Sequence, residues 1–398
     1  MTELARTREA GFATGLALLI PITLSTMAIV LLAPILPLIM DEYKAIPNFE
    51  YWVPMVLTVP ALCVAILSPV AGMLGDYFGR RKLLIGSLAV YGFIGIAPIF
   101  LTDLSAIIVS RLGVGITEAL IMVLTTTMIG DYFSGATRDK WLAAQTACAS
   151  LSALIFFNLG GFLGSFSWRM PFWVYASALL MLVAVLVFTW EPKREGEASA
   201  VAPHNASWAG FPWSRFGGII GVTIFASTLF YTVQIMASSG LTALGSLDPA
   251  RNGFLTSIPS LGVPLGTFIY SRLTGTPIAR LLMVEFAIMG CGFLLMSHAG
   301  SISTFLIGCG VNQIGAGLLL PTLLVWAMSQ LDFDIRSRGA GLWTGAFSLG
   351  QWLSPLIITF FSKQMGGLLP SFSVLGYAAL FALVLTVFGA LRARPKNG

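Results

Sequence analysis

A succession of long apolar runs, separated by short polar loops, constrains the fold of this chain more than any other feature of its sequence. About 20 apolar residues in a helix cross the ~30 Å hydrocarbon core of a bilayer. Of the 398 residues, 57% are hydrophobic and 10% are charged, whereas a soluble domain averages about 25% charged residues. The sequence therefore predicts an all-α membrane protein. We expect twelve spans, at roughly 12–39, 52–75, 82–101, 104–129, 140–165, 170–190, 216–239, 252–273, 279–298, 301–328, 339–362 and 371–391.

One connector is longer than the others and separates the expected spans into two sets of six. Residues 191–212 are rich in Pro, Ala, Gly and charge and lack apolar periodicity, which favours a flexible linker. We therefore expect an N-terminal six-helix half at 1–190, a linker at 191–214 and a C-terminal six-helix half at 215–398.

Positive charge is distributed unevenly between the two sides of the expected membrane protein. Most Lys and Arg residues fall on the side of both termini and the linker, and the other side holds Lys44, Arg169, Arg251 and Lys363. Because cytoplasmic loops carry the excess of Lys and Arg, we expect both termini and the linker to be cytoplasmic, in a multi-pass protein of the inner (plasma) membrane. The net charge of +5 therefore belongs to short loops and does not indicate binding of nucleic acid.

The loop between the second and third expected spans, GMLGDYFGRRK, combines an acid, three cations and three glycines within residues 72–82. A basic cytoplasmic loop accounts for the cations but leaves the acid and the glycine spacing unexplained. The order of these residues resembles the helix 2–3 loop signature of the major facilitator superfamily: Gly72, Asp76, Gly79, Arg80 and Arg81. Tyr77 departs from that signature, because the superfamily usually has Arg or Lys at this position.

This resemblance extends to the plan of the whole chain. Residues 270–284 are a degenerate copy of residues 72–86, and Arg338 follows the tenth span as Arg138 follows the fourth. The resemblance implies twelve helices in two pseudo-symmetric six-helix halves, with a substrate site near the bilayer midplane between them. It implies a secondary transporter, and neither an enzyme nor a protein with a cofactor. We expect a monomer whose partners are a small-molecule substrate, protons and the lipid bilayer.

The resemblance also implies a gate at the cytoplasmic surface. Asp76 would meet the cytoplasmic end of helix 11, and Arg80 with Asp131 would form a relay that locks the outward-facing state. We assign this gating role to a set of six residues: Gly72, Asp76, Gly79, Arg80, Asp131 and Arg138. The alternative is a solvated loop, in which each exposed ion pair contributes less than about 1 kcal/mol.

Two charges lie inside the fourth expected span, where each costs about 2.5 kcal/mol or more at the bilayer centre. Arg111 and Glu118 are seven residues apart, so they leave the same face of the helix about 10 Å apart along its axis. The pattern Arg111-x-x-x-Gly115 resembles the superfamily's helix 4 motif, whose Arg is associated with proton coupling. We therefore expect Glu118 and Arg111 to couple transport to protons. The alternative is a buried ion pair that only holds this span to a neighbour.

Glu118 followed by Ala119 also occurs in this register in the sphingolipid-transporting Spinster group of the superfamily. That group pairs the acid with a second acid in helix 1. The first span here offers only Thr23, Ser25 and Thr26 as interior polar groups, which argues against membership of that group.

Amide and aromatic side chains in the middle of several spans are the candidate lining of a substrate cavity. They are Gln145, Asn158, Tyr231, Gln234, Asn312, Gln313, Gln351 and Trp352. Each could instead make a hydrogen bond between helices. As a group they predict a mostly apolar cavity, which suits a small amphipathic compound better than a sugar.

Other sequence features bear on metal binding, nucleotide binding and the direction of transport. The two histidines and four cysteines show no metal-ligand spacing, and no GxxxxGK[ST] loop for a nucleotide is present. Glu285 lies about five residues inside the ninth span, where we expect its side chain to reach the membrane interface. The fifth span keeps Gly160 and Gly161 of the superfamily's antiporter motif GxxxGPxxGG but has Phe156-Phe157 where Gly-Pro would stand, which weakens a prediction of export.

The sequence thus predicts a proton-coupled carrier of a small, mostly apolar or amphipathic organic compound that works by alternating access, with export slightly preferred. Two alternatives remain open. One is proton-coupled uptake of an organic anion or metabolite, which would replace Glu118 as the partner of Arg111. The other is a non-transporting membrane sensor that has kept the fold.

Overall fold

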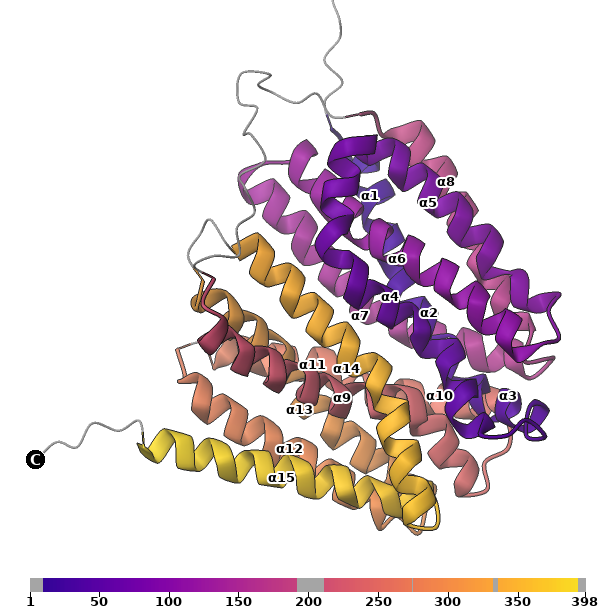
Figure 1. Ribbon diagram of the computed structural model, residues 1–398, viewed down its shortest axis with the longest axis vertical. Coiled ribbons are helices and arrows are strands. Elements are labelled where there is room, and N and C mark those ends of the chain that lie inside the picture. The colour runs from indigo at the N-terminus through magenta and orange to yellow at the C-terminus, as the bar shows by residue number, and fades with distance from the viewer. Residues whose placement is uncertain (1–9, 192–210, 274, 332–335, 393–398) are drawn as a thin grey trace, which may run out of the picture.

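A computed structural model describes residues 10–191, 211–273, 275–331 and 336–392 of the chain, and these residues form helices joined by short turns (Figure 1). The first part of the chain contains α1 (Phe12–Leu19), α2 (Thr23–Val30), α3 (Leu36–Glu42), α4 (Phe49–Phe78), α5 (Arg80–Gly95), α6 (Leu104–Tyr132), α7 (Gly135–Gly164) and α8 (Ser177–Phe188). Short 3₁₀ turns join or extend them: η1 (Ile20–Ile22), η2 (Ala33–Ile35), η3 (Ala97–Ile99) and η4 (Met170–Ala176). The second part contains α9 (Trp213–Ala243), α10 (Pro249–Ser260), α11 (Gly262–Arg272), α12 (Ile278–Ser297), α13 (Ile302–Ser329), α14 (Arg336–Gln364) and α15 (Leu368–Arg392).

Ten of the expected spans coincide with segments of the described chain that are long and apolar enough to cross a membrane. The other two are 252–273, which corresponds to α10 and α11, and 339–362, which lies within α14. Of the expected linker, residues 192–210 lie outside the described part of the chain.

Prolines explain where two of the membrane segments depart from a regular helix. Pro264 has no N–H to donate to the carbonyl of residue 260, and α10 gives way to α11 at Leu261, whose N–H donates to the carbonyl of Ile258 three residues back. In the first segment, η1 and η2 each have a proline at their second residue, Pro21 and Pro34. Such interruptions are tolerated in a membrane where neighbouring helices surround the freed backbone groups.

The helices are arranged in two groups, and Figure 1 shows α1 to α8 on one side and α9 to α15 on the other. Within the first group α4 and α5 pack on α6, and within the second group α12 packs on α13 and α15 while α9 packs on α14. The groups meet where α4 lies against α14 and α7 lies against α10. We call the end where α8 finishes and α9 starts the linker end, and the end of the 43–48 and 244–248 turns the distal end.

Two polar contacts between the groups of helices lie toward the distal end. The Ser238 hydroxyl donates to the carbonyl of Pro34 at 3.1 Å, and Lys363 Nζ lies 3.3 Å from Glu50 Oε2. Nearby, α7 and α10 approach so closely that a Cβ added at Gly253 would lie 2.9 Å from Gly161 Cα. The distal end is therefore held together by both hydrogen bonding and helix packing.

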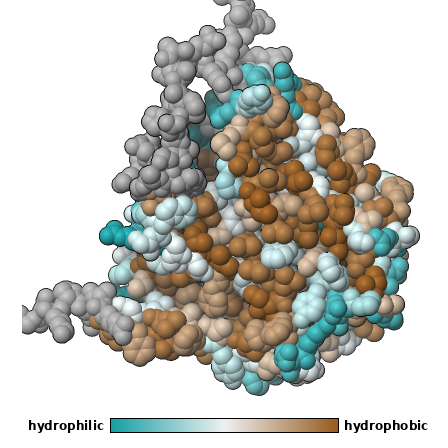
Figure 2. All heavy atoms as spheres, in the orientation of Figure 1, coloured by the Kyte–Doolittle hydropathy of each residue, from teal (hydrophilic) through white to brown (hydrophobic). Residues whose placement is uncertain are grey.

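The flank of the bundle is covered by large hydrophobic side chains, and polar residues gather toward the two ends (Figure 2). The exposed side chains include Ile155 on α7, Leu180 on α8, Phe268 on α11 and Phe381 on α15, each more than half exposed. Such a belt is unfavourable in water and matches the hydrocarbon region of a bilayer.

Candidate substrate cavity and proton site

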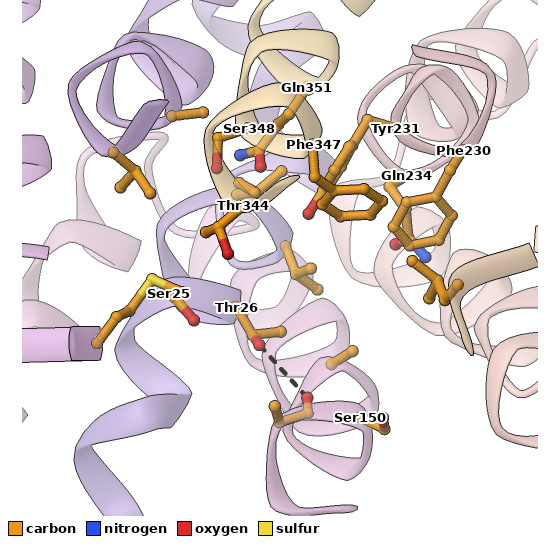
Figure 3. Close-up of a pocket in the computed structure, with 18 of the residues that line it drawn as sticks. Ser25, Thr26, Ser150, Phe230, Tyr231, Gln234, Thr344, Phe347, Ser348 and Gln351 are labelled. Carbon is orange, nitrogen blue, oxygen red and sulfur yellow. Dashed lines mark hydrogen bonds between the residues drawn. The ribbon is translucent and has the colours of Figure 1, made fainter. Parts of the chain in front are cut away.

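A cavity of about 370 Å³ lies between the two groups of helices. The first group contributes α2, α4, α6 and α7 to its wall, and the second contributes α9, the α10–α11 junction, α13 and α14. The polar part of the wall consists mainly of hydroxyl groups, and Figure 3 shows Ser25 and Thr26 across the cavity from Thr344 and Ser348. Most of the wall is apolar, as the sparse polar residues of the spans predicted.

Aromatic rings form one side of this cavity. The ring centroids of Phe230 and Tyr231 on α9 are 4.7 Å apart, and Tyr231 lies 5.4 Å from Phe347 on α14 (Figure 3). Trp343, one helical turn before Phe347, stacks on it with centroids 5.5 Å apart. These four rings all line the cavity, so they can hold an apolar or aromatic body against α9 and α14.

Glu118 brings a carboxyl group to the opposite wall, on α6. Its side chain is 5% exposed, and its Oε2 atom has no hydrogen-bond partner among the described residues. No Lys or Arg nitrogen of the described chain lies within 4.0 Å of the carboxylate. A buried carboxyl without a hydrogen-bond partner is an unusual arrangement in a membrane helix.

Arg111 lies on the same helix but takes no part in the cavity wall. Its side chain is fully buried, and its Nη2 atom donates to the carbonyl of Gly95 at 2.9 Å and to that of Ile94 at 3.4 Å. The guanidinium also lies over the rings of Phe172 and Tyr175, 5.1 and 4.8 Å from their centroids. These contacts put a cation at the C-terminal end of α5, where the helix dipole favours it, and they attach α6 to α5 and η4.

Of the eight residues expected to line the cavity, three do so: Tyr231, Gln234 and Gln351. Asn312 and Gln313 are buried in α13 behind the wall, and they form a chain of hydrogen bonds that starts at Gln234. Gln234 Nε2 donates to Gln313 Oε1 at 2.6 Å, Gln313 Nε2 to Asn312 Oδ1 at 3.3 Å, and Asn312 Nδ2 to the carbonyl of Met289 at 3.4 Å. The chain connects the cavity wall on α9 to α12.

The other three expected residues lie elsewhere. Asn158 is exposed and donates to the carbonyl of Leu154 on its own helix. Gln145 is buried and accepts from the hydroxyl of Thr126, and Trp352 is absent from the cavity wall. An amide or aromatic residue inside a span can face any of several neighbours, and its type alone does not say which face it occupies.

Most of the hydroxyl and aromatic residues that line the cavity were not among those predicted from the sequence. On α14 these residues are Trp343, Thr344, Phe347 and Ser348, and they share a face with Gln351. The other four residues follow Trp343 by one, four, five and eight positions, which is the spacing of a single helix face. This spacing could have identified the cavity face of α14 from the sequence, because four of the five residues carry a polar group inside an expected span.

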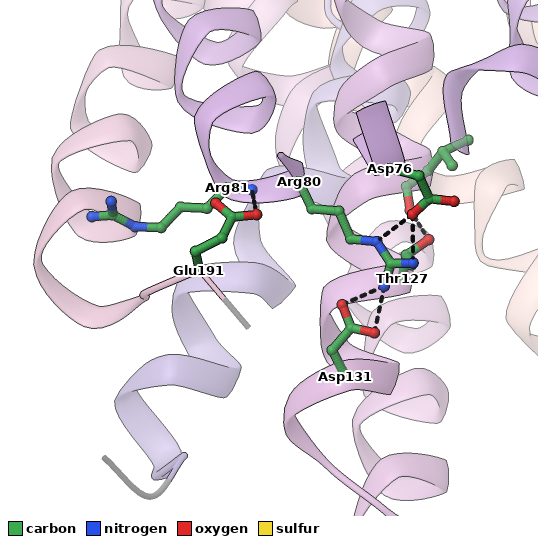
Figure 4. Close-up of polar contacts among 7 residues, drawn as sticks. Asp76, Arg80, Arg81, Thr127, Asp131 and Glu191 are labelled. Carbon is green, nitrogen blue, oxygen red and sulfur yellow. Dashed lines mark hydrogen bonds and ion pairs between the residues drawn. The ribbon is translucent and has the colours of Figure 1, made fainter. Parts of the chain in front are cut away.

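A second cluster of charges lies at the linker end and joins α4, α5 and α6 (Figure 4). Arg80 Nη1 lies 2.5 and 2.6 Å from the two oxygens of Asp131, and Arg80 Nη2 lies 2.8 Å from Asp76 Oδ1. The side chains of Arg80 and Asp131 are 28% and 23% exposed, while that of Asp76 is 50% exposed. The arginine therefore bridges two carboxylates in a partly shielded position.

The other residues assigned to the gate have different surroundings. Gly79 ends α4 with a φ of 91°, a conformation that favours glycine, and this allows the chain to turn directly into α5. Gly72 faces α6, where an added Cβ would lie 3.9 Å from Val123. Arg138 is exposed and pairs with the neighbouring Asp139 at 3.4 Å, so the structure does not bring it to Arg80.

Glu285 differs from the expectation that it reaches the membrane interface. Its side chain is fully buried, and it accepts a hydrogen bond from the hydroxyl of Thr322 at 2.5 Å. Position along a helix measures depth in the membrane but does not show which way a side chain faces. Because α12 presents Glu285 to α13, its carboxyl is held inside the second group of helices.

The sequence and the fold of this chain are similar to those of known membrane transporters. Residues 18–247 match the sequence model of the Major Facilitator Superfamily, which is more than half of the chain. The chain belongs to the Major Facilitator Superfamily. Its all-helical membrane fold and its role as a transporter rather than an enzyme agree with the sequence prediction.

Two characterised superfamily members show the range of relatives. The chain is 25% identical to the 3-(3-hydroxy-phenyl)propionate transporter of Escherichia coli over 72% of each chain. It is 24% identical to the bacillibactin exporter of Bacillus subtilis, over 90% of this chain and 91% of that protein. Among solved structures, a bacterial homologue of the lysosomal transporter Spinster, in an inward-facing occupied conformation, superposes with a TM-score of 0.79 at 14% identity, over 96% of this chain and 98% of that one. This last likeness concerns the fold alone.

Proposed function

We propose that this chain is a proton-coupled secondary transporter that exports a small, mostly apolar or amphipathic organic compound by alternating access. One observation carries the proposal: the Glu118 carboxyl lines a cavity between the two groups of helices, and one of its oxygens has no partner among the described residues. The aromatic wall formed by Phe230, Tyr231, Trp343 and Phe347 supports an apolar substrate.

Glu118 is the group to which we assign the coupling proton. Burial disfavours a charged carboxylate, whereas water or a nearby cation favours it. A conformational change that alters the access of water to Glu118 therefore changes the balance between its two forms. Such a change can load a proton on one side of the membrane and release it on the other.

The two groups of helices are the bodies that would move. We assign residues 1–190 and 215–398 to the two halves, with the linker end and both termini in the cytoplasm and the protein in the inner membrane as a monomer. In this orientation a cavity that is closed at its distal end is inward-facing. The Arg80 cluster at the linker end would then act on the opposite, outward-facing state, by holding α4, α5 and α6 as one unit.

The two alternatives have less support. Uptake of an organic anion would need a cation at the substrate, but Arg111 is fully buried and donates to main-chain carbonyls. A sensor without transport would have no need for a titratable group on the cavity wall. The geometry therefore favours transport of a mostly apolar compound over these alternatives, and the exporter among the relatives supports export as its direction.

The test is transport by the purified full-length chain in proteoliposomes with an imposed pH gradient. We expect a candidate substrate, a lipophilic dye, to accumulate against its gradient with the wild-type chain and not with Glu118→Gln, which keeps the shape of the side chain but cannot titrate. The variant should still exchange substrate without a gradient. If Glu118→Gln concentrates substrate when only a pH difference is applied, the proton site lies elsewhere.

Glu285→Gln is the matched control for this test. Glu285 is also a buried acid in a membrane helix, but it lies between α12 and α13 and is not part of the cavity wall. We expect this variant to keep coupled transport. Equal loss in both variants would indicate a general effect of removing buried charge.

A further inference from the structure

A row of polar side chains on α14 lines the cavity without being used in the structure of the protein itself. Thr344, Ser348 and Gln351 follow one another at intervals of four and three residues, so they lie along one face of the helix (Figure 3). In the part of the chain that the structure describes, these three side chains have no hydrogen-bond partner. Ser25 and Thr26 across the cavity differ, because their hydroxyls donate to main-chain carbonyls. The row on α14 is therefore free to bind a ligand.

Two amide side chains line the cavity, and Gln351 is the one whose polar atoms are both available. Gln234 donates through its Nε2 atom to Gln313, and its Oε1 atom is sealed from solvent. Gln351 is 6% exposed and has no side-chain hydrogen bond to the described residues, yet neither Oε1 nor Nε2 is sealed in this way. Both atoms of Gln351 are therefore accessible from the cavity.

The chemistry of an amide limits what can satisfy Gln351. A primary amide presents an acceptor oxygen and a donor nitrogen side by side in one plane. A ligand pairs with both atoms at once when its own donor and acceptor are adjacent, as when Asn or Gln pairs with the edge of adenine. Lactams, ureas and related heterocycles have such an edge, with an N–H next to a C=O. An ammonium group only donates and a carboxylate only accepts, so neither satisfies both atoms of Gln351.

The aromatic residues of α14 place a flat surface beside this amide. Phe347 lies one helical turn before Gln351, and both line the cavity. Trp343 stacks on Phe347 with ring centroids 5.5 Å apart, and Tyr231 lies 5.4 Å from Phe347 on its other helix. A flat ring packed against Phe347 would therefore present its edge to Gln351, one turn further along the helix.

The charges of the wall leave hydrogen bonding as the means of selection on this side. Among the described residues that line the cavity, the ionisable side chains are Glu118 and Tyr231, and no Lys, Arg or His is present. An anionic group would thus find no cation to pair with. The three polar groups on α14 are neutral at every ordinary pH, so they distinguish ligands by the positions of donors and acceptors.

We propose that Gln351 determines substrate specificity, and that the substrate is a neutral, flat aromatic compound with an amide edge. The Oε1 atom of Gln351 accepts from the substrate N–H, and its Nε2 atom donates to the adjacent C=O. The ring packs against Phe347, and the hydroxyls of Thr344 and Ser348 bind polar substituents. This inference rests on the proposed transport function and adds the hydrogen-bonding pattern of the substrate, which it assigns to α14.

The experiment measures binding by the purified full-length chain, by equilibrium dialysis with the same concentration of non-ionic detergent in both chambers. The two probes have nearly the same shape. Phenanthridinone is a three-ring lactam with an amide edge, and 3,4-benzocoumarin is the corresponding lactone, with a ring oxygen in place of the N–H. We expect saturable binding of the lactam and binding of the lactone that is about tenfold weaker or more, because the lactone places an acceptor opposite the oxygen of Gln351.

Gln351→Leu tests the assignment to this residue, because it keeps much of the side-chain volume but removes both polar atoms. We expect it to weaken lactam binding about tenfold or more and to leave lactone binding nearly unchanged, so that the preference for the lactam disappears. Asn158→Leu is the matched control. It also removes an amide from a membrane helix, but Asn158 is exposed, bonds to its own helix and does not line the cavity. This variant should keep the preference of the wild type.

Three results would overturn the inference: no saturable binding of the lactam, equal affinity of the wild type for the two probes, or an equal loss of both probes in Gln351→Leu. The first two need only the wild-type chain, so they decide the question whether or not the variant folds. These outcomes are distinct from failure of the proposed transport function. A chain that concentrates a dye with a pH gradient but shows no preference for the lactam would refute the amide edge alone. A chain that prefers the lactam through Gln351 but transports neither probe nor dye would refute transport alone.

Discussion

We expect closure of the distal end to depend on a contact between glycines of α7 and α10, so replacement of Gly161 with Ala should weaken it. A Cβ at Gly161 would lie under 3.0 Å from the carbonyl oxygen of Pro249 and 2.9 Å from Gly253 Cα. These are main-chain atoms, so the clash cannot be relieved by a change of side-chain rotamer. Because α7 and α10 belong to different groups of helices, moving the groups apart at this end relieves it without unfolding either one.

The size of the effect follows from the cost of overpacking, which is about 1–3 kcal/mol for an added methyl in a tight site. If that free energy falls only on the distally closed state, the ratio of open to closed molecules rises by about 5- to 150-fold. The assay is labelling of Thr344→Cys, in the cavity, by a membrane-impermeant maleimide added to the side of the distal end. The four native cysteines are replaced in this background. We expect faster labelling when Gly161→Ala is also present.

Gly218→Ala is the matched control, because an added Cβ there meets nothing within 4 Å. It should leave the labelling rate unchanged. Gly253→Ala, which makes the reciprocal clash with the carbonyl oxygen of Phe157, should act like Gly161→Ala. Normal labelling in both α7 and α10 variants, with thermal stability retained, would refute the role of this contact in closure.

Three further predictions concern charged groups. Asp76→Asn should slow transport while leaving substrate affinity in a binding assay nearly unchanged, because Asp76 pairs with Arg80 far from the cavity; normal turnover would show that the pair is only a surface contact. Arg111→Ala should lower the free energy of unfolding by about 2–5 kcal/mol, measured by thermal denaturation in detergent, because it removes a buried side chain and its hydrogen bonds to α5 carbonyls. A stable variant that loses only proton coupling would contradict that structural role. Thr322→Val should destabilise the chain by about 1–3 kcal/mol by leaving the buried Glu285 carboxyl without its donor, and adding Glu285→Leu should restore most of the loss.

The positions of the membrane spans could be predicted from the sequence, because the lipid environment imposes one length and one composition on almost every helix. The break between α10 and α11 was harder to predict from the sequence. Pro264 signals a weak point, but the loss of one hydrogen bond in a membrane helix is often absorbed by its neighbours. Helix α14 is less hydrophobic than most of the spans, because one of its faces carries hydroxyls and an amide that line the cavity.

The candidate site was harder to predict because sequence patterns record side chains and not the main chain. The spacing of Arg111 and Glu118 on one helix face, with the resemblance to the superfamily's helix 4 motif, suggested a role for Arg111 beside Glu118. The partners of Arg111 are the carbonyls at the end of α5, which any sequence would offer at that point. The surroundings of Glu285 were equally hard to predict. Its hydrogen-bond donor is a single hydroxyl on the neighbouring helix, that of Thr322, and hydroxyl residues are common in the spans.

The hydrogen-bond chain that runs from Gln234 through Gln313 and Asn312 to Met289 has a fixed donor-to-acceptor direction. That direction is set at its α12 end, away from the cavity wall. The carbonyl of Met289 can only accept, so it fixes the Nδ2 atom of Asn312 toward α12. That orientation turns the oxygen of Asn312 toward Gln313, and the oxygen of Gln313 toward Gln234. The end of Gln234 that the chain leaves over is therefore its oxygen, which is buried and has no hydrogen-bond partner among the described residues. A main-chain carbonyl on α12, which no side-chain substitution can remove, thus decides which end of the Gln234 amide is left without a partner.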